Sequence, residues 1–367
     1  MKTKLFLLAA VTLLTECNTK QTTQTKEMNQ LSFTTEQAAC MSAIACNEAK
    51  GDIEALESAV HNGLEAELTV SQIKEALSQL YAYTGFPRSL NALGVLQRVI
   101  GDRQAKGVKV LTGNDATSLS EDYNALKQGT AVQTQLTGKP FNYEFAPATD
   151  YYLKAHLFGD IFARDNLTYA DRELVTVSAL SGLQGVEPQL KAHIAGARNM
   201  GVTEEQLQCI IVALAANRLY EEAGRAAKAY YELSCTLNST STPWNAGSPN
   251  TAYAQYFVGN SYLQPYFGGV ANVTFEPACR NNWHIHHGAV QVLICLSGKG
   301  WYQEWNKPAV QLLPGTVIAI PEGVKHWHGA AADSQMQHLA IHTNEQPDAS
   351  NEWLEPVNDK QYSSIEN

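Results

Sequence analysis

The chain has 367 residues, of which 44% are hydrophobic and 17% charged, and its formal net charge is −10 at pH 7. This length allows two or three domains that are each large enough to bury a core. The acidic balance, with no basic cluster interleaved with aromatic residues, excludes a phosphate-binding surface, so nucleic acid is not expected as a partner.

The first residues are typical of an export signal. A positive start, MKTK, precedes the apolar run LFLLAAVTLL, which is too short to span a bilayer. The segment ending at Cys17 resembles a bacterial lipoprotein signal, with Glu16 where a small residue is usual. We expect residues 1–17 to direct export, so that the protein is periplasmic or lipid-anchored in a bacterial envelope. Membrane contact is expected only through a lipid anchor at Cys17, and the polar residues 18–29 are predicted to be a flexible tether.

An internal repeat follows. Residues 33–83 align without a gap with residues 167–217, and in both copies a Thr precedes a Gln or Asp by three positions, which is a helix-start signal. Apolar residues recur every three or four positions, as in buried helices. We therefore predict two similar all-helical units, at 30–107 and 149–236, joined by a linker at 108–148.

These units resemble the carboxymuconolactone decarboxylase family, whose fold is shared with alkylhydroperoxidase-like proteins. The first unit carries LTVSQIKEALSQLYAYTGFPRSLNAL, and the second carries HLFGDIFARDNLTYADRELVTVSALSGL and HIAGARNMGVTEEQL. The resemblance implies a lyase of the decarboxylase type. It also implies ring-like association of the helical units, so we expect a homo-oligomer, specifically a trimer.

Three polar residues of the second unit match the family pattern: Glu173, His193 and Asn199. A carboxylate and an imidazole near an apolar pocket could move a proton next to a lactone carbonyl, which makes Glu173 and His193 candidate catalytic residues. The alternative is that Arg172 and Glu173 only supply solvated charge in the first turn of a helix.

The cysteines bear on a second function that this fold suggests. The alkylhydroperoxidase branch uses a Cys-x-x-Cys dithiol. None of the seven cysteines forms such a pair, and Cys40 and Cys46 lie six residues apart. Peroxidase activity through a dithiol is therefore disfavoured, and an oxidoreductase of the peroxiredoxin or alkylhydroperoxidase type stands as an alternative to the lyase.

A linker at 237–250, rich in Ser, Thr, Asn and Pro, separates the helices from a histidine-rich region. His284 and His286 lie two residues apart, as do His326 and His328, so each pair points to one face of a strand. Neutral imidazoles suit first-row divalent metals. Our candidate metal ligands are His284, His286, Gln291 and His326.

The spacing His-x-His-x4-Gln, with the later Gly-x5-Pro-x-Gly-x2-His, resembles the two motifs of the cupin family, which are double-sheet β-barrels. The segments VTFEPACRNNWHIH, GKGW and EGVKHWHGAA further resemble the mandelonitrile lyase-like, or hydroxynitrile lyase, cupins. The resemblance implies a cupin domain at 251–345 and a divalent transition metal, with Mn placed first and Fe, Ni and Zn as alternatives. It also makes His328 an inward group, not a ligand, that acts as general base or acid.

The remaining histidines and the C-terminus complete the expected site. His338 and His342 share one face of a later strand and are expected to line the substrate pocket, while His287 should point away. Gln291 stands where most metal cupins carry Glu, which leaves the charge of the ion uncompensated. The polar tail at 346–367 is expected to wrap the surface or fray, and suggests no chemistry.

The sequence thus predicts a multidomain α then β chain: two all-α alkylhydroperoxidase-like units followed by a cupin double-sheet β-barrel. The expected activity is that of a metal-dependent lyase acting on a small carbonyl, lactone or hydroxy substrate. Besides the oxidoreductase, a third hypothesis makes the cupin a non-catalytic ligand-binding module on a helical oligomer.

Overall fold

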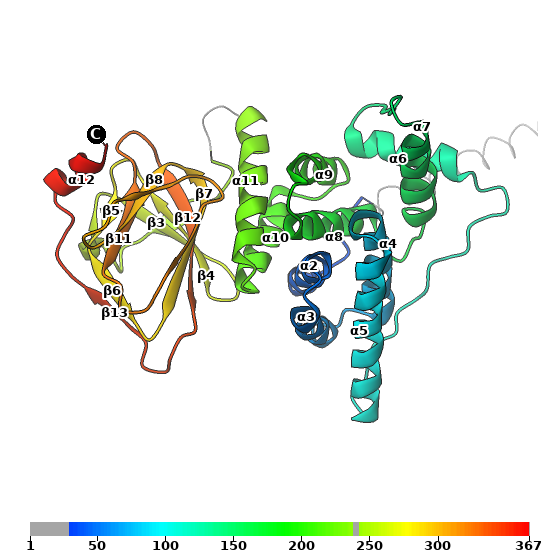
Figure 1. Cartoon of the computed structure of the whole chain (residues 1–367), viewed down its shortest axis with the longest axis horizontal. Helices are drawn as coiled ribbons and strands as arrows, with labels where there is room; N and C mark the ends of the chain where they lie inside the picture. Colours follow the sequence, from blue (N-terminus) through cyan, green and yellow to red (C-terminus); the bar gives the residue numbers. More distant parts are fainter. Residues whose placement is uncertain (1–28, 238–241, 367) are drawn as a thin grey trace, which may run out of the picture. The chain divides into compact units, whose positions relative to one another are not determined.

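The computed structural model describes residues 29–237 and 242–366 (Figure 1). Cys17, the predicted export signal and nearly all of the predicted tether lie outside these residues. The chain divides into two compact units: residues up to Ala179 with Ala192–Thr203, and Leu180–Lys191 with Glu204 to the C-terminus. Within the described ranges, no helix combines the length and apolarity that crossing a membrane requires.

Helices dominate the chain up to residue 237, drawn from blue to green in Figure 1. They are α2 (Thr35–Lys50), α3 (Ile53–Glu65), α4 (Val70–Thr84), α5 (Phe86–Ala105), α6 (Ala125–Thr137), α7 (Pro147–Tyr151), the π-helix η1 (Tyr152–Ile161), α8 (Tyr169–Gly182), α9 (Glu187–Asn199), α10 (Glu204–Ala216) and α11 (Tyr220–Leu237).

The predicted helix starts are confirmed. The Thr34 hydroxyl accepts from the Gln37 backbone N–H while the Gln37 amide oxygen accepts from the Thr34 N–H, and Thr69 with Gln72 repeats this capping box at α4. In the second repeat Thr168 forms the same pair of hydrogen bonds with an aspartate, at 3.0 and 2.9 Å. The repeated signal in the sequence therefore reports a repeated local structure.

A buried polar layer joins the two repeats inside the first unit. Arg172 of α8 is fully buried and donates to the Glu75 carboxylate at 3.0 Å and to the Gln79 amide oxygen at 2.9 Å, both on α4. Removing one partner of such a pair costs about 3–5 kcal/mol, because the other charge stays buried. The reading of Arg172 and Glu173 as solvated charge is therefore wrong, since neither side chain reaches solvent.

Helix α6 lies inside the segment that the sequence marked only as a linker. Its Val132 and Leu136 pack against Leu157 and Phe158 of η1. The two helices approach closely because a side chain at Gly129 would meet the backbone of η1, with an added Cβ only 1.7 Å from a carbonyl oxygen.

The second compact unit, which includes the chain from Glu204 onward, contains an antiparallel barrel of two sheets. Its strands are β1 (Ser248–Pro249), β2 (Phe257–Val258), β3 (Ser261–Pro265), β4 (Val270–Phe275), β5 (Arg280–Asn281), β6 (His284–His287), β7 (Val290–Gly298), β8 (Gly300–Glu304), β9 (Val310–Leu312), β10 (Val317–Ile320), β11 (His326–Ala330), β12 (Met336–Thr343) and β13 (Ser350–Trp353). One sheet has the order β1-β3-β4-β12-β7-β10, and the other has β13-β6-β11-β5-β2 with β8 and β9 beside β11. This is the predicted cupin architecture.

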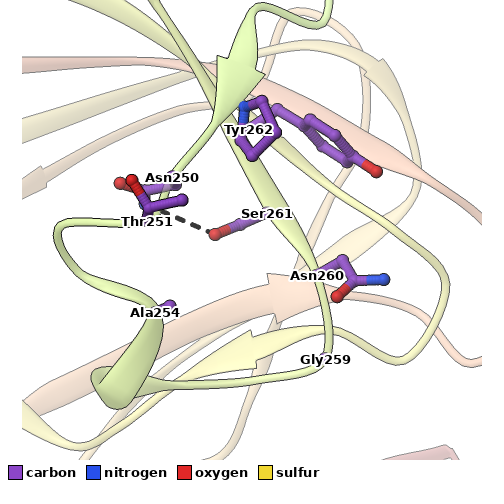
Figure 2. Close-up of a pocket in the computed structure, with 8 residues that line it drawn as sticks. Asn250, Thr251, Ala254, Gly259, Asn260, Ser261 and Tyr262 are labelled. Atoms are coloured by element: carbon purple, nitrogen blue, oxygen red, sulfur yellow. Dashed lines mark hydrogen bonds between the residues drawn. The ribbon is translucent and has the colours of Figure 1, made fainter.

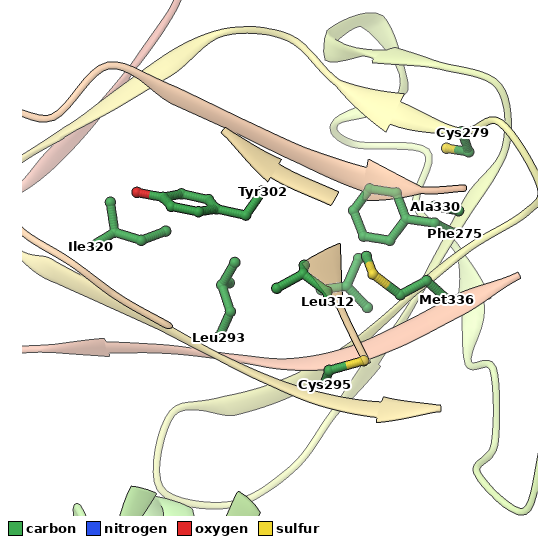
Figure 3. Packing of buried hydrophobic residues seen from close by; sticks show 10 residues of the cluster. Phe275, Cys279, Leu293, Cys295, Tyr302, Leu312, Ile320, Ala330 and Met336 are labelled. Atoms are coloured by element: carbon green, nitrogen blue, oxygen red, sulfur yellow. The ribbon is translucent and has the colours of Figure 1, made fainter. Parts of the chain in front are cut away.

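Apolar side chains from both sheets fill the space between them (Figure 3). Phe275, Leu293 and Met336 from one sheet meet Tyr302 and Ala330 from the other, and all of them are buried. The strands β6 and β11, which carry the histidines, belong to one of these sheets. They pair directly, with His326 opposite His284.

The GKGW turn needs both of its glycines. Gly298 ends β7 with φ +73°, and an added Cβ would lie 1.7 Å from the Gln335 carbonyl oxygen. At Gly300 a Cβ would lie 2.1 Å from the Met336 sulfur and 2.4 Å from the Gly329 carbonyl oxygen. These contacts hold β8 tightly against its neighbours.

The C-terminal residues continue the barrel. Strand β13 pairs with β6, and α12 (Asp359–Glu366) follows it. The Tyr362 hydroxyl donates to the Ala330 carbonyl at 2.7 Å, and Arg280 donates to the Val357 carbonyl at 3.0 Å. The second sheet thus extends past residue 345, where the sequence indicated only a wrapping or fraying tail.

Candidate functional site

Strands β6, β7 and β11 bring the four candidate ligands together. The side chains of His284, His286 and His326 are buried, and their ligand nitrogens all lie within 4.8 Å of one another. The Gln291 amide oxygen lies 3.2 Å from Nε2 of His326, and Gln291 is also buried. The cluster forms because i and i+2 in a strand share a face and because β6 and β11 are neighbours.

Each of the three histidines has its Nδ1 beside a carbonyl-type oxygen. The Nδ1 partners are the Asn282 carbonyl for His284 at 2.9 Å, the Val324 carbonyl for His326 at 2.8 Å, and the Asn351 amide oxygen for His286 at 2.6 Å. Such oxygens only accept hydrogen bonds, so Nδ1 carries the proton of each neutral ring. The Nε2 lone pairs are then left for a metal, which is the usual arrangement around metal-bound histidine.

The surroundings of two Nε2 atoms test whether these residues fit a metal. Nε2 of His286 is buried and makes no hydrogen bond within the described residues. Nε2 of His326 faces the Gln291 oxygen at 3.2 Å, which would set two lone pairs against each other unless a cation or a proton lies nearby. Burial lowers the pKa of His326 to about 4, so a proton is disfavoured at neutral pH. The donor set therefore fits a divalent transition metal.

Burial also keeps the other two candidate histidine ligands, His284 and His286, in their neutral form. Burial, followed by the neighbouring His326, holds the pKa of His284 well below its ordinary value. Burial also lowers the pKa of His286. Neutral imidazole is the form that binds a metal.

His328 lies beside the ligands, as predicted from its position two residues after His326. Its backbone N–H donates to the Asn281 amide oxygen at 2.9 Å, so the amide nitrogen of Asn281 faces the ring and donates to Nε2 at 3.1 Å. This places the proton of neutral His328 on Nδ1. Its ring centroid lies 5.6 Å from that of His284 and 4.9 Å from that of His338.

The two predicted pocket histidines differ in exposure. His338 is fully buried, its Nδ1 lies 3.1 Å from the Leu339 carbonyl oxygen, and its Nε2 makes no hydrogen bond within the described residues. His342 is exposed at the end of β12, and its ring centroid lies 4.8 Å from that of His286. The structure therefore places His338 inside the barrel and His342 at its rim.

Some residues at this site were not anticipated. Asn281 orients His328, Asn351 bonds to His286, the Trp353 ring stacks on His284 at 4.8 Å, and the buried Tyr302 ring lies 5.8 Å from that of His326. Their strands meet the ligand strands only through long-range pairing, which local spacing does not reveal. The apolar residues of WLEPV in the tail were the one available signal of a packed segment.

The helical unit holds a second polar site. The Glu173 carboxylate is fully buried and lies 2.8 Å from Nδ1 of His193, so the predicted pair is in contact. The Tyr83 ring meets the His193 ring edge-on at 5.4 Å. Asn199 does not join them, because its amide donates to the Leu136 carbonyl. A carboxylate that orients an imidazole is a common arrangement for proton transfer.

The cysteines of residues 29–237 and 242–366 form no disulfide. Burial raises the pKa of Cys209 to about 11 and those of Cys279 and Cys295 to about 12. These thiols stay protonated at neutral pH, which argues against the dithiol chemistry of the oxidoreductase alternative.

A cavity of about 320 Å³ lies beside β1 and β3 (Figure 2). It is lined by Pro249, Asn250, Thr251, Ala254, Gly259, Asn260, Ser261 and Tyr262, none of which is a predicted site residue. Its polar groups bond to neighbours, as when Asn250 donates to the Ser261 hydroxyl at 3.3 Å. The cavity thus carries no acid, base or metal ligand set.

The helical repeats and the barrel with its histidine cluster fit a cupin- and decarboxylase-like enzyme. Residues 147–232 match the carboxymuconolactone decarboxylase family, and residues 271–342 match the cupin domain. The chain belongs to the carboxymuconolactone decarboxylase family through the region around residues 147–232 and to the cupins through its C-terminal barrel.

Two named relatives support the two assignments. A protein named (R)-mandelonitrile lyase from Granulicella tundricola is 39% identical over 116 residues, covering 30% of this chain and 87% of its own length. A protein named 4-carboxymuconolactone decarboxylase from Acinetobacter baylyi is 30% identical over 98 residues, covering 25% and 72%. A cupin-like protein of known structure from Thermotoga maritima is 37% identical, with a TM-score of 0.30, and covers 33% of this chain and 95% of its own.

Proposed function

We propose that the barrel is a metal-dependent lyase site that acts on a small hydroxy or carbonyl compound. One observation carries the proposal: three buried histidines, each with Nδ1 beside a carbonyl or amide oxygen, bring their ligand nitrogens together near the Gln291 oxygen, with a further imidazole beside them. The name of the Granulicella tundricola relative suggests a cyanohydrin as the substrate class.

His284, His286, Gln291 and His326 would hold the metal, with Mn placed first and Fe, Ni or Zn as alternatives. When bound, the metal would supply a Lewis acid that polarises an oxygen of the substrate. The remaining chemistry is a proton transfer: the cyanohydrin hydroxyl loses a proton, the carbon–carbon bond to the nitrile breaks, and the leaving cyanide takes a proton. The net products are an aldehyde and hydrogen cyanide.

We assign that proton to His328, whose Nε2 would give up its hydrogen bond from Asn281 to accept it and would then return it to the leaving cyanide. His328 is buried two residues from a ligand, and Asn281 holds its ring in one orientation. His338 lies behind it with a buried and unpaired Nε2. Both imidazoles are buried, and hydrogen bonds are stronger in surroundings of low dielectric constant.

The test combines metal analysis with a substrate screen. The purified protein is expected to contain Mn, Fe, Ni or Zn and to release an aldehyde from cyanohydrins. Chelation should abolish that activity, and return of the metal should restore it. His328→Gln should keep the metal and lose about 10²- to 10⁴-fold in activity, the usual contribution of a general acid or base. A protein that binds none of these metals would end the proposal.

A second activity is favoured by the buried Glu173–His193 pair. This pair is suited to moving a proton beside a carbonyl, as decarboxylation to an enol requires. The Acinetobacter baylyi relative suggests a carboxylated lactone as the substrate class. Turnover of 4-carboxymuconolactone that persists after the metal is removed would support a separate helical site, and no turnover would count against it.

Export, with a lipid on Cys17 as the membrane contact, and assembly into a homotrimer also belong to this proposal. Light scattering coupled to size exclusion tests the assembly, and a monomer alone would exclude the trimer.

A further inference from the structure

Strand β13 contributes two side chains to the surroundings of the candidate metal site. We propose that Asn351 and Trp353 are positioning residues, which hold His286 and His284 from the opposite strand and thereby set the affinity for the metal. The inference rests on the proposed function, because it concerns the same site.

Strand register brings these residues to the ligands. In the antiparallel pairing of β13 with β6, Asn351 lies opposite His286 and Trp353 lies opposite His284. The Asn351 amide oxygen lies 2.6 Å from Nδ1 of His286, and the Trp353 ring stacks on that of His284 at 4.8 Å with the planes 30° apart. Directly opposed residues are the closest side-chain neighbours in such a sheet.

His286 is held differently from the other two histidines. His284 and His326 take their Nδ1 acceptors from backbone carbonyls two residues earlier in the chain. His286 takes its acceptor from a side chain 65 residues later. Substitution can remove a side-chain acceptor without changing the strand, so His286 is the ligand whose orientation can be tested by mutation.

The segment that carries Asn351 is anchored by the residues that follow it. Trp353 stacks on Tyr256 at 4.6 Å with nearly parallel planes. Beyond it, backbone hydrogen bonds of 2.8 and 3.1 Å join Leu354 and Glu355 to Trp283. These contacts fix the strand from which Asn351 reaches the buried His286, so the amide is presented in one place.

The amide oxygen determines which nitrogen of His286 is free. By accepting from Nδ1–H it keeps the proton there and leaves the buried, unpaired Nε2 as a lone pair. Without this acceptor the ring can rotate or shift its proton to Nε2, and either change opposes metal binding. Asn351 is itself exposed, so water can replace part of its role.

The experiment compares three variants of the full chain after its metal has been removed. Asn351→Val suits a strand but accepts no hydrogen bond, whereas Asn351→Asp keeps the acceptor. The matched control is Glu352→Val, which removes the neighbouring contact between the same two strands, the Glu352–His287 pair at 2.8 Å on the other face. Binding of Zn²⁺ alone is measured by competition with a chromophoric chelator.

We expect Asn351→Val to weaken Zn²⁺ binding by about 10-fold, the low end of the range for partners of ligating histidines. Asn351→Asp should bind at least as tightly as the unmodified protein, and Glu352→Val should match it. Trp353→Leu should also weaken binding. Equal binding by Asn351→Val, or an equal loss in Glu352→Val, would overturn the proposal.

A second measurement distinguishes the loss of the Asn351 hydrogen bond from unfolding of the variant. The ¹⁵N shifts of the His286 ring report directly which nitrogen carries the proton, and they should change in Asn351→Val and remain in Asn351→Asp. If Asn351→Val does not fold, Asn351→Ser shortens the side chain beyond reach and takes its place. No zinc binding in the unmodified protein would refute this inference together with the proposed function, whereas normal binding in Asn351→Val would refute this inference alone.

Discussion

The two candidate sites hold an imidazole in opposite ways. In the helical unit, Nδ1 of His193 faces a buried carboxylate, whereas in the barrel the ligand histidines face neutral carbonyl and amide oxygens. A carboxylate stabilises the imidazolium that a proton transfer creates. A neutral oxygen fixes the tautomer and adds no charge, so the lone pair stays available for a metal. The two candidate sites of this molecule thus differ in the charge of the group that orients the imidazole.

The largest expected effect comes from making the helical site resemble the barrel. Glu173→Gln replaces the carboxylate with a neutral amide of the same shape. We expect turnover of a carboxylated lactone to fall by about 10²- to 10⁴-fold, because general acid–base catalysis would lose its charged partner. Metal content, measured by elemental analysis, should not change.

Glu48→Gln is the matched control for this substitution. Glu48 is another buried carboxylate of the helical unit, accepts from the Thr84 hydroxyl at 2.8 Å, and has its pKa raised to about 7 by burial. This variant should keep its activity. If Glu173→Gln were as active as Glu48→Gln, the Glu173–His193 pair would be structural only.

In the barrel, the corresponding test removes one candidate metal ligand. His326→Ala should weaken metal binding by roughly 3 kcal/mol, about a quarter of the 10–16 kcal/mol typical of a four-ligand site. His287→Ala, which removes a half-exposed ring paired with Glu352, should leave metal binding unchanged. Elemental analysis of the folded proteins measures both, and as much metal in His326→Ala as in the unmodified chain would reject the ligand assignment.

The neutral state of the barrel histidines also predicts a pH dependence. A histidine titrates near pH 6.5 in the unfolded chain, whereas burial lowers the pKa of His338 to about 4. Between these values the unfolded chain binds more protons, so the free energy of unfolding is highest above pH 6.5 and falls as the pH decreases toward 4. The loss for such a residue amounts to about 3 kcal/mol.

Denaturant unfolding of the metal-free protein at several pH values measures this slope. His338→Gln removes the titrating group and should make the slope shallower over the same window. An identical slope in this variant would show that His338 is not buried in its neutral form.

The sequence predicted those parts of the molecule that depend on short-range geometry. The histidine pairs two residues apart share a strand face, and Thr34, Thr69 and Thr168 start helices as expected. What it missed depends on contacts between distant segments. Asn351 reaches His286 only because β13 returns to pair with β6, and α6 packs Val132 and Leu136 against residues of η1.

The smallest expected effect on metal affinity concerns His342, which lies at the rim of the barrel. The His342 ring lies 4.8 Å from that of His286, which is closer than His326 lies to His286 at 5.3 Å, so ring distance alone would make His342 a ligand candidate. Among the described residues, however, the group of mutually close ligand atoms comprises His284, His286 and His326, and the His342 side chain is exposed. We therefore expect His342→Ala to change metal affinity by about twofold or less, the usual size for an exposed group outside the coordination sphere. Its turnover of bulky cyanohydrins should change by several-fold instead, because the rim meets the substrate before the metal does. A loss of metal comparable to that of His326→Ala would move His342 into the ligand set and Gln291 out of it.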